Sequence, residues 1–138
     1  MALPPELLDA YRRTHYVVFG EPQLVLRIGE CNADLDELLE AEGAASAAFI
    51  TAANPRGVKR GAWENEIANA ALVKSQTEAG FRCFEGEGRA PDRSWTEKSV
   101  LVVGIGRRDA LVVGRAFEQN AIVFLERGKA PELVVLED

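Results

Sequence analysis

The sequence predicts a two-layer α+β domain, in which a single mixed β-sheet of about five to seven strands carries about three to four helices. Its 138 residues are the size of one domain, so we expect residues 1–138 to fold as a unit. Apolar residues make up 47% of the chain and charged residues 28%, which is typical of a protein with a buried core. Helical and strand patterns alternate along the chain, with several hairpins among them.

The first elements are a short helix and a hairpin. A helix over residues 4–13 is predicted because prolines suit its first turn and its apolar residues share one side. Strands follow at 16–19 and 23–28, the second with strict alternation of apolar residues. The turn residues Gly20-Glu21-Pro22 separate these strands, which indicates a hairpin.

Two helices and a buried strand are expected next. Asp34, with a carboxylate three residues further on, reads as the N-cap of a helix that ends at Gly43. The apolar run 47–51 predicts a buried strand, and it ends at a turn with the sequence Asn54-Pro55. A longer helix is predicted over residues 62–79.

The segment from Glu85 to Lys98 shows no periodicity, so we expect a long loop that acts as a lid over a site. The elements around it are predicted from apolar runs and from helical spacing. They are strands at 81–84, 99–105, 121–126 and 132–136 and a helix over 110–117.

Charge and cysteine usage exclude several classes of function. The net charge of −6 argues against binding to nucleic acid. Cys31 and Cys83 stand far apart and the chain has one histidine, so the common zinc ligand sets are not expected, nor is any cofactor. No window is apolar over 18 residues and no signal sequence is visible, so we expect a cytoplasmic protein that is not bound to a membrane.

A glycine pair in the second half has the appearance of a dinucleotide-binding motif. Gly104-Ile105-Gly106 follows a predicted strand, and Glu126 stands 22 residues after the first glycine. Asp109 occupies the position of the third glycine, however, and its carboxylate would repel a pyrophosphate. Because only 12 residues follow Glu126, the chain lacks the second half of such a fold. We expect a tight strand-to-helix turn capped by Asp109.

The loop after the buried strand is the strongest candidate for a ligand site. It runs from Thr51 to a helix N-terminus at Gly61, where free N–H groups favour an anion. Arg56 lies in this loop with two further cations, Lys59 and Arg60. A solvated connection is the alternative interpretation. Three polar side chains are expected to converge at this strand end, namely Thr51, Asn54 and Asn65.

The predicted lid carries the carboxylates Glu85, Glu87 and Glu97 and a lone aromatic residue, Trp95. Two carboxylates at a suitable separation support general acid and base chemistry, so Glu97 and Glu85 are candidate catalytic residues. Solvated loop charges are the competing interpretation. Trp95 is expected either to anchor the loop or to stack on a ligand.

Several motifs together resemble a bacterial domain-of-unknown-function family, number three-two-nine-three. They are residues 26–30 (LRIGE), 49–55 (FITAANP), 64–65 (EN), 86–88 (GEG), 97–99 (EKS) and 117–121 (FEQNA). The resemblance implies no activity. It directs attention to polar positions at strand ends, which adds Ser99 and Gln119 to the candidate ligand-binding residues and also includes Glu97. Ala53 stands where an aromatic residue is expected, which weakens a stacking role there.

Three functions follow as hypotheses. The first is binding of a small anionic or nucleotide-like ligand at the strand ends. The second is an acidic protein-interaction module of the immunity or regulatory type, whose partner is recognised by charge complementarity. The third is a hydrolase that uses the loop carboxylates. The oligomeric state is left open.

Overall fold

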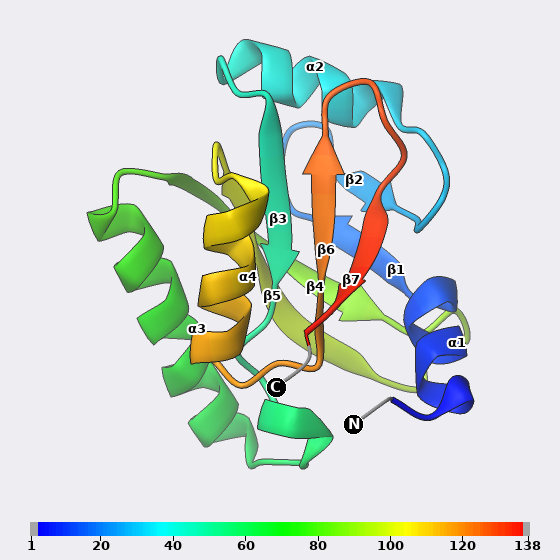
Figure 1. Ribbon diagram of the computed structural model, residues 1–138. Coiled ribbons are helices and arrows are strands. Elements are labelled where there is room, and N and C mark those ends of the chain that lie inside the picture. The colour runs from blue at the N-terminus through cyan, green and yellow to red at the C-terminus, as the bar shows by residue number, and fades with distance from the viewer. Residues whose placement is uncertain (1–2, 137–138) are drawn as a thin grey trace.

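The computed structural model describes residues 3–136, which form one curled sheet with helices packed on it (Figure 1). The α+β prediction is confirmed. The strands are β1 (His15–Val18), β2 (Leu24–Leu26), β3 (Ser46–Ile50), β4 (Arg82–Arg89), β5 (Thr96–Val103), β6 (Ala121–Glu126) and β7 (Glu132–Val135). The helices are α1 (Pro5–Arg13), α2 (Ala33–Ala41), α3 (Ala62–Glu78) and α4 (Arg107–Ala116), with a 3₁₀ turn η1 (Pro55–Gly57).

The sheet has seven strands in the order β2-β1-β4-β5-β3-β6-β7. Every neighbouring pair among the described residues is antiparallel, so the sheet is more regular than the mixed sheet expected. Strand β3 lies between β5 and β6, although α4 connects these two strands directly along the chain. This insertion brings the end of β3 next to the start of β5 and the start of β6.

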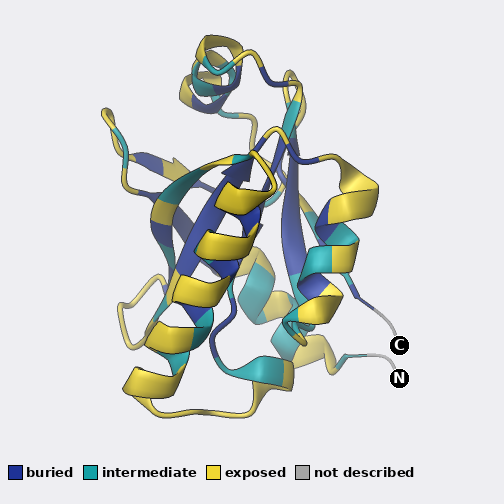
Figure 2. Ribbon diagram, turned by 90° about the vertical axis from the view of Figure 1, so that its left-hand side faces the viewer, coloured by how far each residue is buried: buried dark blue, intermediate teal, exposed yellow. Residues whose placement is uncertain are grey.

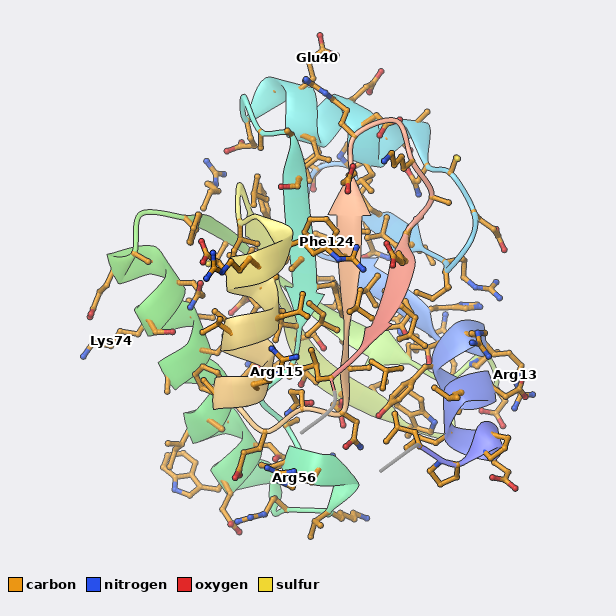
Figure 3. The ribbon with its side chains drawn as sticks, viewed as in Figure 1. Arg13, Glu40, Arg56, Lys74, Arg115 and Phe124 are labelled. Atoms are coloured by element: carbon orange, nitrogen blue, oxygen red, sulfur yellow. The ribbon has the colours of Figure 1, made fainter. Side chains whose placement is uncertain are left out.

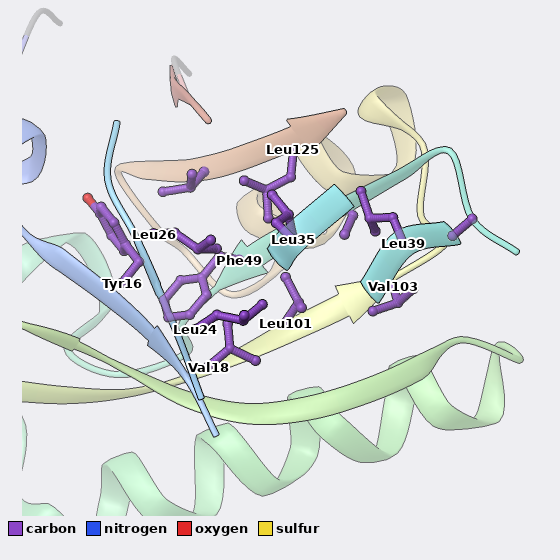
Figure 4. Close-up of a cluster of buried hydrophobic side chains, with 13 residues drawn as sticks. Tyr16, Val18, Leu24, Leu26, Leu35, Leu39, Phe49, Leu101, Val103 and Leu125 are labelled. Carbon is purple, nitrogen blue, oxygen red and sulfur yellow. The ribbon is translucent and has the colours of Figure 1, made fainter. Parts of the chain in front are cut away.

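The two faces of the sheet carry separate apolar clusters. The inner face, which bears Phe49, Leu101 and Leu125, is covered by α2 (Figure 4). The outer face bears alternate residues of the same strands, such as Ile50 and Val102, and packs against α3 and α4. Since side chains alternate across a strand, each residue's parity along the strand decides which face it occupies.

The sheet curls far enough to bring its two ends close together. Leu24 and Leu26 of the edge strand β2 pack in the same inner cluster as Leu125 of β6. The N–H of Gly29, just after β2, donates to the carbonyl of Pro131, just before β7, at 2.9 Å. The inner face is therefore a trough, and α2 covers one end of it.

The expected lid over residues 85–98 is wrong. Residues 82–89 and 96–103 form a long hairpin, with only a short turn between them. Gly86 and Gly88 hide its strand pattern, because they occupy the inner-face positions where apolar side chains would otherwise reveal alternation. A Cβ at Gly86 would collide with the carbonyl oxygen of Val17 on β1 and lie 3.1 Å from the ring of Phe49.

Two predicted helix caps are also wrong by a few residues. Asn32 caps α2 in place of Asp34, because its Oδ1 accepts from the Leu35 N–H at 3.0 Å. Gly106 in extended conformation begins α4, which leaves Asp109 in the first turn of that helix. The short polar residues were correctly placed at helix starts, but the tertiary connections choose which residue is extended at the boundary.

Candidate functional site

A cavity of about 590 Å³ lies at the end of the inner face opposite α2. It is enclosed by α1, by the end of β3, by the start of β5 and by the connection between α4 and β6. Figure 1 shows α1 and η1 at this same end of the sheet, where β3 ends and β6 begins. The volume is in the range of pockets that hold small molecules. Its most informative lining residues are Tyr11, Asn54, Lys59, Trp95, Glu97 and Gln119.

Asn54 is the centre of the polar network in this cavity. It follows β3 in the left-handed conformation (φ 46°, ψ 62°), which asparagine tolerates better than most residues. Its Nδ2 donates to Oε2 of Glu97 at 2.9 Å, and its Oδ1 accepts from Nδ2 of Asn65 and from the N–H of Arg60, both at 2.9 Å. Its own N–H donates to Oδ1 of Asn65 at 2.9 Å. These bonds hold the side chain in one orientation.

Glu97 is a half-buried carboxylate that lines the cavity. It is on the inner face because it shares parity with Ser99 and Leu101 on β5. Burial raises the pKa of Glu97, and the hydrogen bond from Asn54 opposes this only in part. A carboxylate with a raised pKa in a concave site is the kind of group that binds a hydrogen-bond donor or transfers a proton.

Aromatic side chains form the apolar part of the cavity. Tyr11 projects from α1. Burial is the main cause that raises the pKa of its phenol, and the nearby charge of Glu97 raises it further. Tyr16 and Phe49 lie deeper and meet edge to face, with ring centroids 5.3 Å apart. The ring of Trp95 lies over Gly88, where a Cβ would be 3.7 Å from its Cζ3. The indole thus lies against the backbone of β4.

Three other predicted residues line the cavity but bind backbone groups. The Thr51 hydroxyl donates to the carbonyl of Lys98 at 2.7 Å and accepts from the Ala53 N–H at 3.0 Å. The Ser99 hydroxyl donates to the carbonyl of Glu97 at 3.0 Å. Nε2 of Gln119 donates to the carbonyl of Ala53 at 3.2 Å. These bonds tie together the strand ends that present Asn54 and Glu97.

Three predicted residues are not part of the cavity lining. They are Arg56, Glu85 and Asn65, whose side-chain amide is hydrogen-bonded to Asn54. Arg56 lies on η1 (Figure 3), where its side chain is exposed and its Nε stands 3.9 Å from Oε1 of Glu118. Glu85 is exposed, and its parity on β4 places it on the opposite face of the sheet from Glu97. Glu87 shares that outer face and pairs with Arg89 at 2.9 Å. The carboxylates of β4 and Glu97 therefore do not form an acid–base pair in the cavity.

Tyr11 and Asn120 are cavity residues that the sequence reasoning assigned to other roles. Tyr11 was expected only on the apolar side of a helix, and no sequence signal shows that this side faces a cavity. The position of Asn120 between a helix and a strand would suit a helix cap, but α4 ends at Ala116 and its C-cap is Phe117. Its Nδ2 instead lies 3.5 Å from the Tyr11 hydroxyl, a contact between residues 109 positions apart. Lys59, one of the three expected loop cations, does line the cavity.

The raised pKa of Glu97 predicts a stability difference that depends on pH. Because the folded state holds this proton more tightly than the unfolded state, the contribution of Glu97 to stability is complete at low pH and declines as pH rises through its folded pKa. The substitution Glu97→Gln, which keeps an oxygen for Asn54, is expected to make the protein more stable than the wild type at neutral pH. Urea unfolding at a series of pH values measures the difference.

The gain from Glu97→Gln should shrink as pH falls from about 7 to about 4, where the wild-type carboxyl becomes protonated in both states. Glu85→Gln is the matched control, since Glu85 is exposed on the other face and should show no such pH-dependent gain. A Glu97→Gln protein that loses stability at neutral pH would contradict the prediction.

The described residues offer neither a metal site nor a membrane-spanning helix. Within residues 3–136, no group of three or more His, Cys, Asp or Glu side chains is arranged to hold a metal ion. In the same part of the chain, no helix combines the length and the apolar character needed to cross a bilayer.

Comparison with known proteins gives a match to a family model. Neither the curated proteins nor the solved structures contain a match to this chain. A family model described as "Protein of unknown function (DUF3293)" matches residues 50–122, which is just over half of the chain. The matched segment contains Asn54, Asn65, Glu97 and Gln119 but leaves out α1 with Tyr11. The chain therefore belongs to the DUF3293 family of proteins of unknown function.

Proposed function

We propose that this protein binds a small, planar, nucleotide-like ligand in the cavity at the end of the inner face. The observation that carries the proposal is the Asn54–Glu97 pair, which lines a cavity of about 590 Å³ with its geometry already set by hydrogen bonds. Ligand sites are typically concave and apolar with a few fixed polar groups. An oriented carboxylate beside an oriented amide suits the donor and acceptor edge of a heteroaromatic base.

The aromatic side chains support a planar ligand. Tyr11 and Trp95 both line the cavity, one from α1 and the other from the turn of the β4–β5 hairpin. Stacking of a base on an aromatic ring contributes about 1–3 kcal/mol per base in proteins that bind single bases. These two rings therefore give a ligand apolar contact area while Glu97 and Asn54 read its edge.

The charges indicate how an anionic ligand would lie. An anion about 4 Å from ionised Glu97 would be repelled by about 4 kcal/mol at the effective dielectric of a protein surface. Lys59 is the cationic residue among the described residues that line the cavity. We therefore assign the base of the ligand to Glu97 and its phosphate or carboxylate to Lys59, rather than to the Arg56 position favoured by the sequence.

Thermal shift and calorimetry with nucleobases, nucleosides and nucleoside monophosphates test this assignment. At a free concentration about a hundred times its Kd, a monophosphate that binds is expected to raise the free energy of unfolding by about 2.7 kcal/mol. Lys59→Ala should weaken binding of the monophosphate by about tenfold, which corresponds to about 1.4 kcal/mol of binding free energy. It should leave the affinity for the nucleoside unchanged. Glu97→Gln should weaken both, because both present the same base edge.

Glu85→Gln is the control for charge alone, since it also removes one carboxylate but does so on the outer face. It should leave all affinities unchanged. If no member of the panel stabilises the wild type, or if Glu85→Gln and Glu97→Gln change affinity equally, the proposal is wrong.

A second candidate function is proton transfer by Glu97 during hydrolysis of a bound ligand. The raised pKa of this carboxyl favours it, because the shift increases the share of the protonated form that a general acid needs. The same panel, extended to simple esters and glycosides, would be monitored for products. Catalysis is supported if the wild type turns over a substrate and Glu97→Gln abolishes turnover while still binding that substrate. If the wild type binds a ligand without turnover, only the ligand-binding function remains.

A further inference from the structure

Helix α3 carries an apolar stripe on the side that faces away from the sheet. Its inward side is buried through Asn69, Leu72 and Gln76. Its outward side leaves Trp63 74% exposed and Ile67 53% exposed, and most of the helix is coloured as exposed in Figure 2. Single exposed apolar residues are common, but a tryptophan and an isoleucine four residues apart on one helix form a continuous surface.

The stripe continues with small residues toward the end of the helix. Ala70 and Ala71 are exposed and follow Ile67 at helical spacing, so they lie on the same side as Trp63 and Ile67. Alanines at this position allow another helix to approach closely, since they project little from the backbone. The stripe therefore has a large half, formed by Trp63 and Ile67, followed by a flat half, formed by Ala70 and Ala71.

Charged residues lie near both ends of the stripe. Their order is such that two antiparallel copies of α3 place opposite charges next to each other. Glu64 stands at its start, preceded by Arg60 in the loop that leads into the helix, and Lys74 and Glu78 stand at its end. In an antiparallel pairing centred at the level of Asn69, each cation faces an anion at both ends. A parallel pairing would instead place each charge opposite its own copy. Like charges so placed repel, so the pattern selects the antiparallel arrangement.

The existing ion pairs leave these side chains available. Arg60 contacts Glu64 at 3.8 Å and Lys74 contacts Glu78 at 4.0 Å, and all four side chains are exposed. Exposed pairs of this kind contribute little, about 0–1 kcal/mol. Figure 3 shows Lys74 extending away from the body of the molecule. These side chains can therefore turn toward a second helix with little loss of stability from the existing ion pairs.

We propose that α3 is the interface for a second copy of this chain, with the two helices antiparallel about a two-fold axis. Ile67 then packs on Ala71 of the partner subunit, and the large half of each stripe meets the flat half of the other. Glu64 faces Lys74 of the partner subunit, and Arg60 faces Glu78 of the partner subunit. The interface is isologous, which is the commonest form of dimer. It involves one helix from each copy, so the dimer is weak and concentration-dependent.

Sedimentation velocity over a range of concentrations tests the dimer. The wild type is expected to shift from monomer to dimer as concentration rises, and Ile67→Glu is expected to remain monomeric. Val25→Glu is the matched control, because Val25 is also an exposed apolar residue but lies on β2. It should dimerise as the wild type does. Circular dichroism of the variants checks that they are folded.

A pair of charge variants tests the antiparallel register directly. Glu64→Lys alone and Lys74→Glu alone each place like charges opposite one another twice, so each should weaken its own dimer by about tenfold. Mixed together they restore two attractive pairs, so a heterodimer should form. A wild type that stays monomeric at all concentrations, an Ile67→Glu protein that dimerises normally, or equal mixtures that form no heterodimer would each overturn the proposal. The proposal is also wrong if the protein stays monomeric and uses α3 to bind a different protein.

Discussion

The substitution Gly86→Ala is expected to lower the free energy of unfolding by about 3 kcal/mol, the upper end for an overpacked core site. Gly86 stands on β4 between β1 and the ring of Phe49. An added Cβ would collide with the carbonyl oxygen of Val17, and this oxygen belongs to a backbone that is paired on both sides. Because neither strand can move without breaking its ladder, the strain is not relieved. Denaturant unfolding followed by circular dichroism measures the loss.

Gly88→Ala is the matched control for this prediction. Gly88 lies two residues further along β4 on the same inner face, but its added Cβ would meet Thr14 and Trp95 side chains at 3.6 and 3.7 Å. Those are ordinary contacts, so the cost should stay below about 1 kcal/mol. Equal losses in the two variants would show that glycine is needed at these positions for some reason other than the close approach of β1.

The substitution Asn54→Ala is expected to destabilise the protein by about 3 kcal/mol. It removes the amide that donates to Glu97 and accepts from Asn65 and Arg60, and each such bond contributes about 1 kcal/mol. It also places a residue with a Cβ but no compensating side chain in the left-handed region, which costs about 1–2 kcal/mol. Some of the loss is offset because the Arg60 N–H can be hydrated. Urea unfolding at neutral pH checks the value.

Asn54→Gly separates the two causes, because glycine adopts the left-handed conformation freely. It should destabilise by about 2 kcal/mol, which is the share of the hydrogen bonds alone. A glycine variant as stable as the wild type would mean that the bonds to Glu97 and Asn65 do not support the fold. A glycine variant as damaged as the alanine variant would mean that backbone conformation contributes nothing.

Local patterns predicted the class of the fold and most of its elements. The strand at Ala121–Glu126 was predicted with the observed bounds, because its apolar run is flanked by polar residues on both sides. Helix α3 was predicted nearly to its end, since Gly80 ends the helical pattern. The β4–β5 hairpin was missed. Its inner face has glycine at 86 and 88, where an apolar side chain would show the alternation, and at Gly86 the close approach of Val17 explains this choice.

The candidate site was predicted in part. Among the polar residues expected at strand ends, Asn54 is hydrogen-bonded to both Asn65 and Glu97. Arg56 and Glu85 were chosen by the same reasoning and lie elsewhere, because proximity along the chain and membership of one loop do not determine the side of a strand. Tyr11 was missed because the position of α1 depends on contacts with residues more than a hundred positions away.

By itself the sequence determined the α+β class and the net negative charge, since periodicity and composition can be read without knowledge of the partner strand. It also marked Asn54 and Glu97 as polar residues at element ends. Only the tertiary structure decided that these two side chains meet at 2.9 Å across 43 positions and line a cavity. That outcome follows from the insertion of β3 between β5 and β6 and from the parity of β5. Strand order and parity are set by the packing of the whole sheet, which no local pattern contains.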